Sequence, residues 1–158
     1  MLTSFLTKKD IDPLAWAEKS FDAGFDTYGS WQFNVAQAAD CCGDKVEFCT
    51  VRLRSFKQLY NQIARGIPAV VSVRGSLRGA PKKYDNGHVL VVVGWDAKKR
   101  HVLCHDPALT SDQETLKRYD IESFIEAWER SRRLTYFANP RHVSVKTDFA
   151  DKKGKGAG

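Results

Sequence analysis

Residues 86–107, NGHVLVVVGWDAKKRHVLCHDP, contain the strongest pattern in the sequence. Two apolar runs flank a polar break at 96–99, which is typical of a β-hairpin. Folding the chain back about Ala97 places His88 nearly opposite Asp106, because the two residues are equidistant from that turn. Directly opposed residues share a sheet face, with Cβ atoms roughly 5 Å apart. The hairpin therefore predicts an imidazole beside a carboxylate that can orient it, as a general base and its partner require.

Spacing alone leaves two interpretations of this pair open. One is a functional pair of base and orienter. The other is a histidine at a loop-to-strand junction and a separate Asp-Pro turn, both of which are common in proteins. The hairpin symmetry could also shift by a residue or two, so geometry favours neither interpretation over the other.

The remaining pattern predicts an α+β fold with helices first and a mostly antiparallel sheet after them. Asp12, Ser30 and Ser55 are placed to cap helices, and Gly43 and Gly66 to end them. A charged segment at 75–86 and a second segment at 109–114 are expected to be loops. Helices are expected over 14–21, 31–42, 56–65 and 121–128, and further strands over 45–53, 67–73, 116–119 and 134–137.

The composition is that of a globular domain with a basic surface. A chain of 158 residues forms one domain with its own hydrophobic core, and an apolar content of 42% is ordinary for such a domain. Part of the net charge of +6 comes from the basic clusters at 130–133 and 152–155, which are not interleaved with aromatic residues. We therefore expect a solvated basic surface and no nucleic-acid partner.

Membrane segments, metals and cofactors are not predicted. No stretch approaches the roughly 20 apolar residues of a membrane helix, and residues 1–6 lack the features of a signal peptide. The cellular location stays open. His101, Cys104 and His105 crowd one strand, but alternate residues of a strand face opposite sides, so a metal site there is disfavoured.

The cysteines do not supply an obvious nucleophile. Cys104 lies two residues before Asp106 and so shares its sheet face, but a strand interior does not stabilise a thiolate, and we rank it only as a weak substitute. Cys41 and Cys42 end a predicted helix, where the helix dipole opposes a thiolate. Cys49 is most simply a packing residue, and the disulfide state of all four cysteines stays open.

The order of several segments resembles the bacterial peptidase C39-like cysteine peptidases, which have a papain-like fold. The resemblance spans roughly residues 12–140, and its most specific element is the Gly-His strand followed by Asp-Pro-Ala. It implies that His88 is the general base and Asp106 its orienting partner, and that Trp31, Asn34 and Gly87 lie near the substrate cleft. The segments that carry it are 28–36, 52–55, 66–73, 86–95 and 106–108, with Tyr119 and the helix at 124–128.

The resemblance also implies a missing nucleophile. The family places its catalytic cysteine at the N-terminus of a helix, in a Cys-x-Pro-Thr-like motif preceded by an oxyanion-hole glutamine, and neither motif occurs here. Residues 1–6 are similar to the second half of that helix, so the cysteine is expected about two turns before Met1. We therefore expect residues 1–146 to form one C39-like domain that is incomplete at its N-terminus, followed by a disordered basic tail at 147–158.

Three functions follow from these observations. The first is thiol-dependent hydrolysis of a peptide or protein substrate. The sequence as written is expected to be nearly inactive in this reaction, because it lacks the catalytic cysteine. The second is a non-catalytic peptide-binding module on the same fold, and the third and weaker one is an acyltransferase or amidase. Without the nucleophile helix, apolar surface stays uncovered, so the chain is expected to be poorly soluble or to need a partner.

One departure from the family pattern leaves the substrate open. The family more often has Asn and Pro where this chain has Ser30 and Gln32. The simpler interpretation of Trp31 and Phe33 is packing in the core and beside the helix cap.

Overall fold

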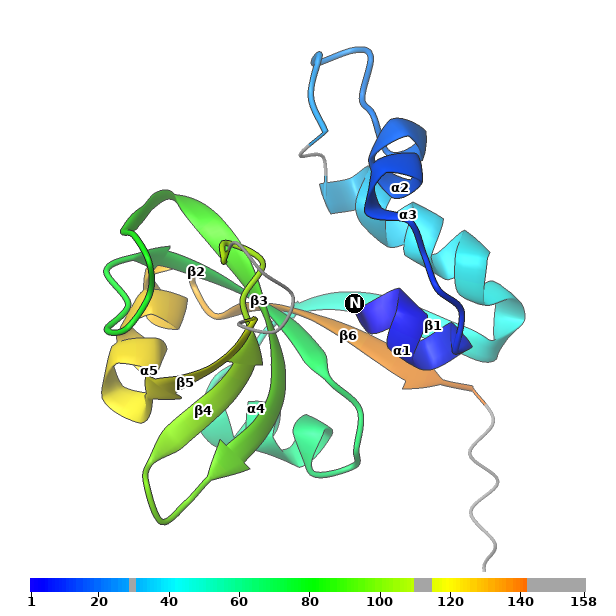
Figure 1. The fold of residues 1–158 in the computed structure, drawn as a ribbon. Helices are drawn as coiled ribbons and strands as arrows, with labels where there is room; N and C mark the ends of the chain where they lie inside the picture. Colours follow the sequence, from blue (N-terminus) through cyan, green and yellow to red (C-terminus); the bar gives the residue numbers. More distant parts are fainter. Residues whose placement is uncertain (29–30, 110–114, 142–158) are drawn as a thin grey trace, which may run out of the picture.

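The structure is a computed structural model that describes residues 1–28, 31–109 and 115–141 (Figure 1). It has an α+β fold with a six-stranded antiparallel sheet, as the sequence predicts. The helices are α1 (Leu2–Thr7), α2 (Pro13–Lys19), α3 (Trp31–Cys42), the 3₁₀ helix η1 (Gly43–Lys45), α4 (Phe56–Ile63) and α5 (Ile121–Arg130). The strands are β1 (Val46–Arg52), β2 (Ala69–Gly75), β3 (Tyr84–Asp96), β4 (His101–His105), β5 (Leu116–Asp120) and β6 (Leu134–Pro140).

Local signals account for where most helices begin and end. The side chain of Asp12 accepts a hydrogen bond from the backbone N–H of Leu14 at 3.0 Å, and Pro13 is the first residue of α2. Gly43, with a φ of 59°, follows the last residue of α3, as expected for a residue that ends a helix. Gly66, with a φ of 77°, comes shortly after the end of α4, also as expected. The expected cap at Ser30 and the expected tail at 147–158 lie outside the described residues.

The expected loop at 75–86 is confirmed over residues 76–83 and wrong at both ends, because the strands on both sides are longer. Strand β2 runs to Gly75, which pairs with Tyr84 at the start of β3. The pairing is irregular between Val73 and Gly75, and both Gly75 and Gly87 have positive φ, at 78° and 88°. Lys82 and Lys83 stay exposed before the strand, whereas Tyr84, the first residue of β3, is buried in the core.

The predicted register of the hairpin is also wrong, by two residues. Val91 pairs with His105 and Val92 with Cys104, so the position opposite Asp106 falls on Leu90 rather than on His88. The turn is displaced because Asp96 Oδ1 accepts hydrogen bonds from the N–H groups of Lys98 and Lys99, both at 3.1 Å. A further shift between Val92 and Gly94 adds a bulge. On the His88 side of this bulge, the shift of two residues keeps the side chains on their predicted faces.

One face of the sheet carries the hydrophobic core. Helices α4 and α5 pack on this face (Figure 1). Helix α4 contacts β2 and β3, and α5 contacts β2, β4 and β5. Its residues on β2, β3 and β4 are fully or almost fully buried: Ala69, Val71, Val73, Leu90, Val92, Val102 and Cys104. Large side chains of α4 and α5 complete the cluster, among them Leu59, Phe124 and Trp128.

The opposite face is only half covered. Helices α1, α2 and α3 gather on the side of β1 and β6 (Figure 1), and α1 lies over a cavity of about 250 Å³ that is lined by Pro68, Val91, Val93 and His105. Val91 and Val93 are partly exposed, whereas their neighbour Val92 is completely buried. Among the described residues, no helix is long and apolar enough to cross a membrane.

Candidate active site

His88 and Asp106 meet although the sheet does not pair them. Nε2 of His88 lies 2.8 Å from Oδ1 of Asp106. Asp106 follows β4 directly and is fully buried, while the His88 side chain is 17% exposed near the start of β3. Gly87, with its φ of 88°, gives the strand the local irregularity that precedes His88. The two residues that the hairpin predicts to be neighbours are therefore in contact.

The carboxylate of Asp106 accepts four hydrogen bonds. Oδ1 accepts from His88 and from the backbone N–H of Ala108 at 2.9 Å. Oδ2 accepts from the hydroxyl of Tyr84 at 2.7 Å and from that of Tyr119 at 2.5 Å. An ionised carboxylate has about four acceptor positions, so this buried group is fully satisfied.

These bonds keep Asp106 ionised. Burial by itself would raise the pKa of the carboxyl group, but the hydrogen bonds from His88, Tyr119 and Tyr84 outweigh it and hold the pKa below its usual value. A carboxylate can only accept, so Nε2 of His88 carries the proton. The other ring nitrogen, Nδ1, is then the basic one, and it has no hydrogen-bond partner among the described residues.

Two tyrosines that were not candidates from the sequence complete the cluster. Burial, and next the hydrogen bond to Asp106, raise the pKa of both the Tyr84 and the Tyr119 hydroxyls, so both stay protonated donors. The ring of Tyr84 also stacks on His88, with centroids 4.2 Å apart. Tyr84 lies in the segment expected to be a loop; its signal would have been its spacing of four residues from His88 on a continuous strand.

The four cysteines take no part in the hydrogen bonds of this cluster. Cys104 is fully buried in the core, and burial, with the nearby Asp106 charge, raises the pKa of its thiol. Burial also raises the thiol pKa of Cys42 at the end of α3 and of Cys49 on β1. Strand β1 is three strands away from β3, a separation of about 14 Å. All four cysteines are free, and no hydrogen bond joins Cys41, Cys42, Cys49 or Cys104 to His88 in the described part of the chain.

Comparison with known proteins places the chain in a family. A crystal structure of a candidate C39-like peptidase from Bacillus anthracis superposes with a TM-score of 0.62 over 89% of this chain and 84% of the other, at 14% sequence identity. That likeness shows a shared fold. The model of the Peptidase_C39 like family matches residues 1–136. The chain belongs to this family. No curated protein matches the sequence.

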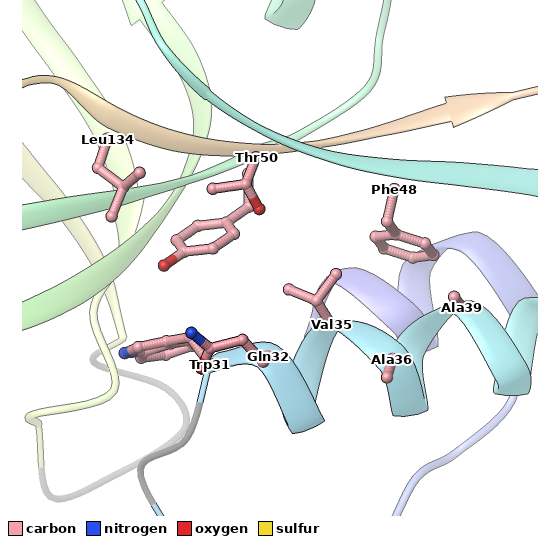
Figure 2. A pocket seen from close by; sticks show the side chains of 9 residues that line it. Trp31, Gln32, Val35, Ala36, Ala39, Phe48, Thr50 and Leu134 are labelled. Atoms are coloured by element: carbon pink, nitrogen blue, oxygen red, sulfur yellow. The ribbon is translucent and has the colours of Figure 1, made fainter.

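In this C39-like chain, Trp31 and Asn34 line cavities whose lining does not include His88. Trp31 begins α3 and lines an apolar cavity of about 590 Å³ between α3 and strands β1 and β6 (Figure 2). Trp31 is 41% exposed, and its ring lies 5.6 Å from that of Tyr136, centroid to centroid. Asn34 Oδ1 accepts a hydrogen bond from Nε1 of Trp16 at 3.0 Å. The cavity is lined by Trp31, Gln32, Val35, Ala36, Ala39, Phe48, Thr50, Leu134 and Tyr136.

The structure thus separates the predicted site residues into two groups. His88, Asp106 and Gly87 lie together at one end of β3, with Cys104 buried nearby. Trp31 packs against Tyr136 of β6, and Asn34 accepts a hydrogen bond from Trp16 of α2. Trp31 is 41% exposed and Phe33 49% exposed, so the interpretation of these two residues as core residues is wrong. In the described ranges, no group of three or more His, Cys, Asp or Glu side chains could hold a metal ion.

Proposed function

We propose that this domain belongs to a thiol-dependent peptidase in which His88 is the general base and Asp106 orients it. One observation supports this most directly: Nε2 of His88 donates to an ionised, fully buried carboxylate, which leaves Nδ1 as the basic nitrogen. Orientation of an imidazole by a buried carboxylate is the arrangement that nucleophilic hydrolases use to activate a thiol or hydroxyl.

The chemistry follows from the position of the proton. Nδ1 takes the proton of a cysteine thiol, and the thiolate attacks the carbonyl carbon of the scissile amide. The imidazolium then gives that proton to the leaving amine nitrogen, and a thioester remains. Nδ1 next deprotonates the water that hydrolyses the thioester, which regenerates the thiol. Asp106 stays ionised and stabilises the imidazolium in both steps.

We also propose that the nucleophile comes from a helix that continues α1 toward the N-terminal side. Helix α1 lies over the half-covered sheet face, next to Val91 and Val93. An apolar helix that extends α1 would cover more of this face. Removal of one member of such a catalytic unit lowers the rate by roughly 10⁴ to 10⁶-fold. The 158 residues by themselves are therefore expected to be nearly inactive.

The experiment adds a helix that carries a cysteine before Met1, taken from the upstream reading frame or from a C39-like relative. Peptide hydrolysis is measured for this extended chain and for its Cys→Ala, His88→Ala and Asp106→Ala variants. His101→Ala is the matched control, because His101 lies at the far end of the hairpin. We expect hydrolysis that the first three substitutions abolish and the control preserves. Equal rates with and without His88 would refute the assignment.

A second candidate is a peptide-binding module without turnover. It is favoured by the cavity beside Trp31 and Tyr136, which is present in a chain whose four cysteines form no hydrogen bond with His88 in the described residues. This function predicts that peptides quench the fluorescence of Trp31 in the extended chain as well, with no hydrolysis and no thioester. Turnover by the extended chain would reject it.

A further inference from the structure

Asp106 is held from three strands at once. Tyr84 and His88 come from β3, Tyr119 comes from β5, and Asp106 itself follows β4, which lies between the other two. The two tyrosine hydroxyls share one carboxylate oxygen, and His88 and the Ala108 N–H share the other. Two donors on each oxygen define the plane of the carboxylate, which a single bond to His88 would leave free to rotate.

We propose that Tyr84 and Tyr119 are positioning residues that fix the Asp106 carboxylate against His88 and thereby set the tautomer of the imidazole. With Oδ2 held by two hydroxyls, Oδ1 is directed at Nε2 of His88, which must then carry the proton. The basic nitrogen is therefore always Nδ1. That Nδ1 serves as a catalytic base rests on the function proposed above, whereas the tautomer is a property of the folded chain.

Both tyrosines are suited to this task. Tyr84 is 3% exposed and Tyr119 is fully buried, so water does not compete for Oδ2. Their raised pKa values keep them protonated over the physiological range, so neither donor is lost on titration. Tyr84 has a second role, because its ring stacks on His88 with the ring planes 21° apart and limits rotation of the imidazole.

The titratable groups that face Asp106 are few and can be followed separately. They are Tyr84 and His88 from β3, Cys104 from β4 and Tyr119 from β5. Removing the hydroxyl of Tyr84 or Tyr119 removes one hydrogen bond from the buried Asp106 carboxylate. The pKa of Asp106, measured as the midpoint of its titration, should then rise by about one unit or more. Removing both hydroxyls frees the carboxylate to rotate, so that His88 is no longer confined to one tautomer.

The test is nitrogen and carbon NMR of the full chain, labelled at histidine and aspartate, as wild type and as Tyr84→Phe, Tyr119→Phe and the double variant. We expect wild-type His88 to be protonated at Nε2 when the ring is neutral. The double variant should show both tautomers, and each single variant should show a raised Asp106 midpoint. The single variants carry the test if the double variant does not fold.

Two controls separate positioning from stability. Tyr60→Phe removes the hydroxyl of a tyrosine that is 43% exposed and should change neither readout. Phe124→Leu perturbs the core beside the cluster without removing a hydroxyl, and should lower the unfolding free energy only. If both tyrosine variants lose stability but keep the wild-type tautomer and midpoint, the proposal is overturned. Neither readout needs hydrolysis, so this result would stand whether or not the proposed function is correct.

Discussion

The imidazole of His88 lies nearly parallel to the ring of Tyr84, with ring centroids 4.2 Å apart, and both side chains donate to the same carboxylate. Tyr84 and His88 are four residues apart on one strand, so they point to the same face of the sheet. The stack and the shared acceptor make the position of the imidazole depend on β3 as a whole, since the strand carries both rings.

Replacing Tyr84 separates these two contributions. Tyr84→Phe keeps the ring and loses the bond to Asp106, and should lower the unfolding free energy by about 1.5–3 kcal/mol, because the bond is to a buried charge. Tyr84→Ala also loses the stack and leaves a cavity, at a cost of about 3–5 kcal/mol. Urea denaturation at pH 7 measures both values. Equal losses for the two variants would show that the ring contributes nothing.

The stability of the chain should depend on pH through Asp106. Its pKa is lower in the folded state than in the unfolded state, so its contribution is present above the unfolded pKa of about 4 and is lost as the pH falls below that value. This group should account for a loss of up to about 1.4 kcal/mol per pH unit. Between pH 7 and pH 2, the unfolding free energy of Asp106→Asn should fall less steeply with falling pH than that of the wild type. The exposed Asp44→Asn variant should keep the wild-type slope.

Gly87 and Gly94 form a matched pair on β3. Gly87 has a φ of 88°, and a Cβ there would approach nothing closer than a backbone oxygen at 3.9 Å, so substitution strains the backbone alone. Gly87→Ala should cost about 1–2 kcal/mol. A Cβ at Gly94 meets Leu103 at an ordinary 3.6 Å, so Gly94→Ala should change stability little. Thermal unfolding compares them, and a larger loss for Gly94→Ala would contradict the assigned cause.

Cys104 should be inert in the native protein. Its thiol is fully buried and its pKa is raised, so thiolate is scarce and hidden. We expect iodoacetamide to modify Cys104 only in denaturant, as followed by mass spectrometry of peptides, whereas the partly exposed Cys41 reacts in the folded chain. Rapid native labelling of Cys104 would reopen it as a nucleophile.

Substitutions of two adjacent valines test the difference in burial between the two faces of the sheet. Val92 is completely buried, so Val92→Ala should cost about 2–3 kcal/mol, whereas Val91→Ala on the half-covered face should cost less than about 1 kcal/mol. In a chain extended at the N-terminus, the proposed helix would bury Val91 more deeply. The cost of Val91→Ala should then rise toward that of Val92→Ala. An unchanged cost would argue that the added helix packs elsewhere.

Sequence patterns predicted the elements and the central pair but not the details that depend on irregular backbone. Alternation and glycine stops placed β1, α3 and α4 to within a few residues. The register of β3 and β4 was missed because a bulge near Gly94 and the turn at Asp96 are set by local hydrogen bonds rather than by hydrophobicity. Even so, His88 and Asp106 were predicted together, since a shift of two residues preserves the face.

Such patterns could not predict the cluster around Asp106 or the cavity around Trp31, for different reasons. Tyr84 follows Lys82 and Lys83, and this charged context favours a loop over a strand. The cavity depends on Tyr136, which lies more than 100 positions after Trp31 along the chain. Local periodicity does not indicate which distant strand pairs with β1.

Strand β6 is the last strand along the described chain, yet it lies between β1 and β2 and is the partner of β1 in the sheet. During synthesis on the ribosome, β1 therefore has to wait for residues 134–140 before its backbone N–H and C=O groups are paired. Such long-range pairing slows folding and leaves strand edges exposed in the nascent chain. Pairing of β1 is thus expected only once residues 134–140 have left the ribosome, and a chaperone can bind the unpaired strand in the interval before that.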